Sequence, residues 1–127
     1  DLNNNTITYG YEGDLLTGVT DTAGRTTAIT YNEENKISNI KDQRENPTSY
    51  TYDSEGNLET VTDPMGYITR YGYDQNHNLV EVTSPAGTKY RLSYDAEGHL
   101  TGAADGLNNT TEFTWNFQDG LSELTDP

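Results

Sequence analysis

The segment TYDSEGNLETVTDPMGYITRY, residues 51–71, carries the clearest local pattern in the chain. Residues 53–57 combine an acidic side chain that can bond its own backbone with a glycine that is free to take a positive φ, as tight hairpin turns require. Residues 63–66 place Asp, Pro and Gly at the first, second and fourth positions of a type I turn. Residues 58–62 and 69–73 read as strands, the second with large residues alternating with small or polar ones. The segment therefore predicts two short strands and two turns.

This pattern recurs along the whole chain with a period of about 21 residues. Each copy has an aromatic anchor, a bulky apolar residue two places before it, Leu or Ile six places after it, and a further apolar residue nine places after it. The anchors are Tyr11, Tyr31, Tyr52, Tyr73, Tyr94 and Trp115. The later positions include Leu58, Leu79, Leu100, Val61 and Val82. The first copy is one residue short, and the missing residue falls in its first turn, where deletions are tolerated best.

We expect these copies to form a single array over residues 1–127, a segment of a larger protein. The fold class predicted is all-β: about six two-stranded hairpins in one continuous twisted antiparallel sheet. Burying four apolar side chains yields about 6 to 12 kcal/mol per copy, whereas ordering the backbone costs about 1 to 2 kcal/mol per residue. One copy therefore cannot fold alone, and stability must come from pairing between neighbours. The end strands are unpaired edges, for which we expect edge-to-edge homodimerisation of this piece.

Composition narrows the function classes. Leu, Ile, Val and Phe are scarce and the net charge is −14, as in disordered chains, but ten tyrosines argue for order. The acidic balance repels phosphate backbones, so we expect no nucleic-acid partner. No apolar run approaches the ~20 residues needed to cross a bilayer, so we expect no membrane insertion. The absence of cysteine excludes disulfides, thiolate metal sites and cysteine nucleophiles.

Several side chains are candidates for chemistry. His77 and His99 lie in the first turns of consecutive copies, where a shared metal is the alternative to solvated turn residues. The acidic residues of these turns superficially suggest calcium loops, but no segment has the ligand spacing of an EF-hand, so turn capping is the preferred interpretation. These acidic residues are Asp53, Glu55, Asp74, Asp95 and Glu97. No carboxylate pair stands out for a hydrolase. We expect no catalytic, cofactor or metal site.

The aromatic anchors leave two alternatives. A row of exposed rings is a platform for stacking sugars, whereas a row on the inner face is a packed core. The position two residues before the anchor accepts Ile29 and Leu92 as well as tyrosine. Because aliphatic replacement suits packing better than stacking on sugars, the core is the preferred interpretation and glycan binding the alternative.

The combination of YDxxGxL, V-T-D-P-x-G and T-x-Y-x-Y resembles the YD repeats of the RHS family, with the best copies at residues 52–66, 73–87 and 94–100. That family includes bacterial RHS and wall-associated toxin-delivery proteins, shell subunits of insecticidal toxin complexes, and teneurins. The resemblance implies a β-sheet shell that encloses a C-terminal toxin, or a role in cell-surface adhesion in the teneurins. It carries over no catalytic residue.

The resemblance also implies structural roles for the repeat positions, among them Asp63, Gly66 and Gly87 in the second turns. Departures are Asn35, Glu45, His77 and Asn108 at expected glycines, and Ser84 at an expected aspartate. We expect a secreted or cell-surface scaffold that is not an enzyme. Its expected partners are neighbouring repeats, and an enclosed toxin region or a surface glycan. Adhesion or carbohydrate binding is the alternative function, and a hydrolase the remote one.

Overall fold

The computed structural model describes residues 5–116 and 120–126, and its regular elements are all β-strands. Their bounds are β1 Ile7–Glu12, β2 Leu15–Asp21, β3 Thr26–Tyr31, β4 Ile37–Lys41, β5 Pro47–Tyr52, β6 Leu58–Thr62, β7 Ile68–Tyr73, β8 Leu79–Thr83, β9 Lys89–Tyr94, β10 Leu100–Ala104, β11 Thr110–Trp115 and β12 Leu121–Thr125. Two strands arise from each repeat, because each repeat carries two turn sequences that interrupt β-favouring residues.

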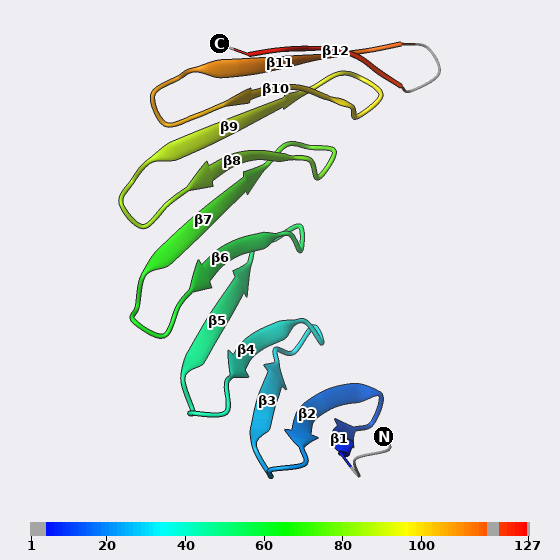
Figure 1. The fold of residues 1–127 in the computed structure, drawn as a ribbon, viewed down its shortest axis with the longest axis vertical. Helices are drawn as coiled ribbons and strands as arrows, with labels where there is room; N and C mark the ends of the chain where they lie inside the picture. Colours follow the sequence, from blue (N-terminus) through cyan, green and yellow to red (C-terminus); the bar gives the residue numbers. More distant parts are fainter. Residues whose placement is uncertain (1–4, 117–119, 127) are drawn as a thin grey trace. The chain divides into compact units, whose positions relative to one another are not determined.

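All twelve strands belong to one sheet, whose order follows the sequence from β1 to β12 (Figure 1). Every pairing whose register is defined is antiparallel, as hairpin connections require. The predicted all-β hairpin array is confirmed. Among the described residues, no helix is long and apolar enough to cross a membrane.

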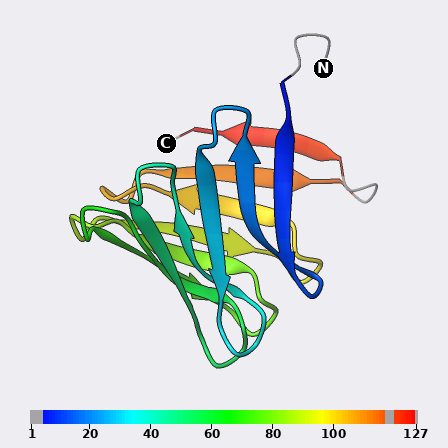
Figure 2. The ribbon, with the colours of Figure 1, turned by 90° about the horizontal axis from the view of Figure 1, so that it is seen from below.

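The first hairpin has the short connection that the sequence predicts. Glu12 pairs with Leu15, so that only Gly13 and Asp14 lie between β1 and β2. The tight connection between these two strands is drawn in blue in Figure 2. Gly13 has a φ of 60°, as a two-residue hairpin loop demands. The missing residue is therefore absorbed in the turn, and the strands that flank it keep their pairing.

A β-bulge lies beside the anchor of each hairpin whose register is defined. In the hairpin β7–β8, Tyr73 pairs with Leu79, whereas Gly72 pairs with Glu81. Val80 is the extra residue on β8, opposite no partner of its own. Such an insertion moves the side chain of every later residue on its strand to the opposite face of the sheet.

This bulge explains the repeat spacing. Leu79 and Val82 are three residues apart, which in a regular strand places them on opposite faces. The bulge returns Val82 to the face of Leu79, where it pairs with Tyr71, two residues before the anchor Tyr73. All four apolar positions of the repeat thereby share one face. Equivalent shifts occur at Gly10/Tyr11, Thr30/Tyr31, Leu100/Gly102 and Thr114/Trp115.

Two compact units divide the chain, one of Asp1–Thr51 with Thr60–Tyr67 and the other of Tyr52–Glu59 with Ile68–Pro127. The apolar face of each unit consists of half-buried side chains except in β1 and β12, where it is exposed, and no hydrophobic side chain among the described residues is fully buried. The enclosed interior expected for the repeat positions is thus a half-covered face. The physical reason is that a single sheet has no second layer packed on it.

Candidate functional site

The first candidate feature is the row of anchors, of which Tyr31 and Trp115 use their ring-end donors in bonds to the backbone. In one unit the Tyr31 hydroxyl donates to the carbonyl oxygen of Leu16 at 2.8 Å. In the other unit the Trp115 indole Nε1 donates to the carbonyl oxygen of Leu100 at 2.7 Å. Both acceptors follow the anchor of the preceding repeat: Leu16 lies five residues after Tyr11, and Leu100 lies six residues after Tyr94. Tyrosine and tryptophan are interchangeable here because each carries a donor at the end of a large apolar ring.

The second candidate feature is the turns, and the two turns of a repeat have the same geometry. The first residue of each turn donates its N–H to the carbonyl four residues on, and accepts at its own carbonyl from the N–H three residues on. Nine turns within the described residues follow this scheme; they begin at Asp21, Asn32, Asp42, Asp53, Asp63, Asp74, Ser84, Asp95 and Asp105. The 21-residue repeat is therefore made of two near-equivalent halves of 10 and 11 residues.

Side chains of the first turn residues complete the scheme. In the turn that begins at Asp53, the carboxylate Oδ1 accepts from the N–H groups of Glu55 and Asn57, both at 2.9 Å. The other oxygen, Oδ2, accepts from the side-chain Nδ2 of Asn57 at 3.0 Å. We call this last contact the turn brace. Equivalent braces join Asp42 to Asn46, Asp74 to Asn78, Asp105 to Asn109, Asp95 to His99 and Asp21 to Arg25.

These bonds lower the pKa of the braced aspartates below the ordinary value. For Asp53 and Asp74 the largest cause is the bond from the partner amide, Asn57 or Asn78. For Asp95, desolvation opposes the change, but the backbone and side-chain bonds from His99 outweigh it and leave its pKa lowered. Of the acidic residues for which the sequence favoured capping over calcium binding, Asp53, Asp74 and Asp95 cap their turns, whereas Glu55 and Glu97 donate backbone N–H groups to Asp53 and Asp95.

Residues that depart from the expected glycine adopt the glycine conformation. Asn35, Glu45, His77 and Asn108 have φ values of 59°, 64°, 64° and 65°, beside 88° for Gly56. Asparagine tolerates this left-handed region, whereas for other residues it costs about 1 to 2 kcal/mol. The substitutions therefore leave the fold of the turn intact and strain it locally.

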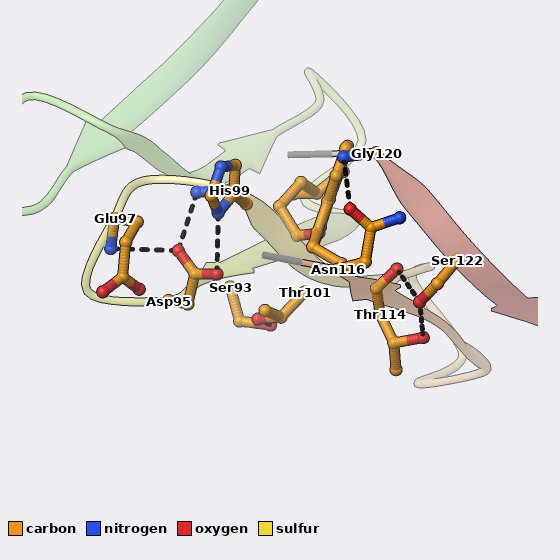
Figure 3. A network of polar contacts seen from close by, with 11 residues as sticks. Ser93, Asp95, Glu97, His99, Thr101, Thr114, Asn116, Gly120 and Ser122 are labelled. Atoms are coloured by element: carbon orange, nitrogen blue, oxygen red, sulfur yellow. Dashed lines mark hydrogen bonds and ion pairs between the residues drawn. The ribbon is translucent and has the colours of Figure 1, made fainter. Parts of the chain in front are cut away.

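The two histidines make different contacts. His77 Nδ1 lies 2.7 Å from Oδ1 of Asn57 in the first turn of the preceding repeat, and this contact joins the two repeats. His99 Nδ1 lies 3.0 Å from Asp95 Oδ2, and its ring stacks on Trp115 with centroids 5.2 Å apart. One group of potential metal ligands comes together within the described residues, and it consists of Asp95, Glu97 and His99 (Figure 3). Their ligand atoms lie within 4.8 Å of one another. His77 does not belong to this group.

Polar and apolar groups of the described residues line shallow, open hollows. One of about 330 Å³ lies between consecutive first turns and is lined by Asp53, Glu55, Tyr73 and Asp74, among others. On the polar face, Glu81 of β8 accepts from Lys89 of β9 at 2.6 Å and lies 3.4 Å from Arg91. The bond from Lys89 is the largest cause of the lowered pKa of Glu81.

The apolar repeat positions lie on one face of each hairpin whose register is defined, and Asp63, Gly66 and Gly87 lie in the second turns. Internal anchors are half-buried, whereas Tyr11 in β1 is 63% exposed and Leu121 in β12 is 50% exposed. The end hairpins have a neighbour on one side, and this accounts for the difference. Half-buried members of the set are Tyr31, Tyr52, Tyr73, Tyr94, Trp115, Leu58, Leu79, Leu100, Val61, Val82 and Asp63, and Gly66 and Gly87 are exposed.

Reasoning from the sequence missed three features: the bulge, the turn brace and the stack of His99 on Trp115. The first has a signal, namely the odd spacing of Leu79 and Val82. The second has one in the recurrence of Asp and Asn four residues apart, as in Asp53 and Asn57. The third depends on how two repeats lie side by side, for which the local sequence gives no sign.

Comparison with known proteins gives one family and one fold. A family model for the RHS Repeat matches residues 31–64, 52–89 and 73–111, together more than half of the chain. The crystal structure of TcdB2-TccC3-Cdc42 is similar with a TM-score of 0.79 and 16% identity, over 96% of this chain and 7% of that one. The crystal structure of TcdB2-TccC3-TEV is similar with a TM-score of 0.76 and 16% identity, over 94% of this chain and 7% of that one. No curated protein matches this chain.

Proposed function

The chain belongs to the RHS repeat family, and on that premise we propose that it is a segment of the wall of a larger β-sheet shell whose task is to enclose and deliver a toxin region of the same protein. The role is structural, and no residue of the segment is assigned to catalysis. The segment spans 7% of the length of the solved chains that it resembles, so the enclosed region and its delivery belong to the proposal.

The observation that carries the proposal is the uniform, extendable sheet. Its strands follow the order of the sequence, and the nine turns share one bonding scheme, so a further hairpin adds the same contacts as the last one. The exposed repeat positions at both ends support continuation. Tyr9 and Tyr11 of β1 are 56% and 63% exposed, and Leu121 and Leu124 of β12 are 50% and 51% exposed.

A pair of matched deletions in the full-length protein tests the wall. Removing residues 53–73 deletes one whole repeat and keeps strand direction and the apolar face in phase. Removing residues 53–62 deletes one strand with its turn and reverses the direction of every later strand. We expect the region that follows the repeats to stay protected from added protease in the first variant and to be digested in the second. Digestion to the same extent in both, and in the parent, would contradict enclosure.

Adhesion through glycan binding is the alternative function. It is less well supported, because Tyr31 and Trp115 commit their ring-end donors to the carbonyls of Leu16 and Leu100. A sugar can reach the exposed rings of Tyr9 and Tyr11 in β1, at 56% and 63%, and, away from that edge strand, those of Tyr67 and Tyr90, at 55% and 45%. Binding to a glycan panel that is lost on changing Tyr67 and Tyr90 to alanine favours this alternative. A hydrolase remains the remote alternative, and turnover that a single carboxylate change abolishes would support it.

The partners that we propose are neighbouring repeats at both edges. For the isolated chain, this predicts association through the edge of β1, where Ile7 is 62% exposed and Tyr9 is 56% exposed. Charges on an edge strand block such pairing, so Ile7→Lys with Tyr9→Lys is expected to make the chain monomeric in sedimentation experiments. A parent chain that is already monomeric at high concentration would contradict the edge partner. A secreted or surface location goes with the proposed delivery role.

A further inference from the structure

His99 occupies a position that an amide fills in other repeats. It lies five residues after the anchor Tyr94, as Asn57 does after Tyr52 and Asn78 after Tyr73. Its Nδ1 lies 3.0 Å from Asp95 Oδ2, the same brace that Asn78 makes to Asp74 at 3.0 Å. This repeat therefore closes its turn with a group that titrates near neutral pH instead of a neutral amide.

The same imidazole reaches the next repeat. Its ring stacks on the indole of Trp115 in β11, with centroids 5.2 Å apart and planes inclined by 24°. The indole itself is fixed by its bond from Nε1 to the carbonyl oxygen of Leu100 at 2.7 Å. His99 thus connects the turn between β9 and β10 to the anchor of the hairpin β11–β12.

The groups around the ring favour its charged form. On its own turn, Asp95 bonds the ring nitrogen, and Glu97 has a carboxylate oxygen within 4.8 Å of the other ligand atoms (Figure 3). On β11 the facing group is the neutral indole of Trp115, whose π face attracts a cation at this distance. On the preceding hairpin, the turn carboxylate Asp74 is held by Asn78.

From this geometry we infer that His99 is a pH-sensitive clasp between two consecutive repeats, closed more tightly when its imidazole is protonated. Protonation turns the hydrogen bond to Asp95 into an ion pair and the stack on Trp115 into a cation–π contact. Because both contacts are strengthened only for the charged imidazole in the folded chain, this contribution is complete at the acidic end of the histidine range and is lost as the pH rises through it. The joint between these two repeats is therefore firmer in mildly acidic surroundings.

The chain has a single tryptophan, which makes its fluorescence a direct readout of the clasp. A protonated imidazole stacked on an indole quenches its emission. We expect emission to fall in one titration step between about pH 8 and about pH 5, the range in which histidine changes charge. EDTA in the buffer removes any metal that Asp95, Glu97 and His99 could hold, and circular dichroism at each pH shows whether the sheet is retained.

Three variants make the test specific. His99→Asn restores the amide of the other repeats, so it is expected to fold and to lose the titration step. His77→Asn removes the other histidine and is expected to keep the step. Asp95→Asn keeps the capping oxygen, as Asn32 does at the same position of another turn, and is expected to move the midpoint of the step to lower pH.

A flat emission profile in the parent chain, or a step that survives His99→Asn, would overturn the clasp. If the step disappears in His77→Asn, the titrating group is His77, and this result would also overturn the clasp. The urea midpoint gives an independent readout: the parent is expected to exceed His99→Asn by more at about pH 5.5 than at about pH 8. Equal differences at both pH values would contradict the inference.

Discussion

The indole Nε1 of Trp115 donates to the carbonyl oxygen of Leu100 at 2.7 Å, across the boundary between two repeats. The Tyr31 hydroxyl makes the corresponding bond to Leu16 at 2.8 Å in the other unit. Tyr31 and Trp115 therefore join their repeats to the preceding ones by a directed bond as well as by apolar contact. At these two anchors the bond needs a ring with a terminal donor, whereas the position two residues before an anchor accepts Ile29 and Leu92.

Removing only the anchor donor tests this account. Tyr31→Phe keeps the ring and deletes the hydroxyl, leaving the Leu16 carbonyl without that donor, and is expected to lower the free energy of unfolding by about 1 kcal/mol. Tyr67→Phe makes the same chemical change at a ring that is 55% exposed and is expected to have little effect. Urea unfolding followed by circular dichroism measures both. Equal losses of unfolding free energy in the two variants would show that the hydrogen bond from Tyr31 to Leu16 does not stabilise the fold.

The turn brace can be removed with a control in the same turn. Asn78→Ala deletes the amide that bonds Asp74, whereas Asn76→Ala alters a residue whose backbone N–H, not its side chain, bonds that carboxylate. We expect the urea midpoint to fall clearly in the first variant and little in the second. If the second variant loses as much as the first, the side-chain brace does not stabilise the turn.

Low pH is expected to unfold the array through its turn aspartates. The pKa values of Asp21, Asp42, Asp53, Asp74, Asp95 and Asp105 are lowered in the folded chain. The unfolded chain therefore binds protons more readily, so this stability is complete above the ordinary aspartate pKa of about 3.9 and is lost as the pH falls below it. Urea midpoints measured from neutral pH down to about pH 2 should fall steeply below about pH 4. A constant midpoint over that interval would rule out this role for the carboxylates.

Backbone strain predicts opposite effects of glycine at two turns. Glu45 has a φ of 64°, so Glu45→Gly is expected to raise the free energy of unfolding by roughly 0.5 to 1 kcal/mol. Gly66 has a φ of 85°, so Gly66→Ala is expected to lower it by about 1 kcal/mol. Gly10→Ala is the control, since its φ is not positive and its new Cβ meets its neighbours at 3.7 Å or more. Stabilisation by Gly66→Ala would contradict the conformation assigned to these turns.

Close approach between neighbouring second turns gives a rescue experiment. A Cβ at Gly106 meets the Cγ2 methyl of Thr88, so Gly106→Ala is expected to cost about 1 to 3 kcal/mol of stability. Thr88→Ser removes that methyl and is expected to restore part of the loss in the double variant. Strict additivity of the two changes in thermal unfolding would show that these turns do not touch.

The hairpin array itself follows from the sequence, because its determinants are local. Asp63, Pro64 and Gly66 determine a turn by their own conformational preferences, and strand pairing follows from consecutive turns. The bulge at Val80 is harder to predict from the sequence, because the odd spacing of Leu79 and Val82 is the only sign of it. The common geometry of the first and second turns of a repeat is not evident from the sequence, because Glu45 adopts the positive φ of a glycine although it is not a glycine.

Features that depend on neighbouring repeats could not be predicted. The stack of His99 on Trp115 joins residues from different hairpins, and its formation depends on the relative position of those hairpins in the sheet. The half-covered apolar face also needed coordinates, because a pattern of apolar residues does not reveal whether a second layer covers them.

Cryo-electron microscopy of the full-length protein tests the wall most directly. We expect residues 1–127 to lie within a longer sheet, with further strands hydrogen-bonded to the outer edges of both β1 and β12, around a filled interior. A map in which this array stands as a separate module, with both of those edges facing solvent, would contradict it.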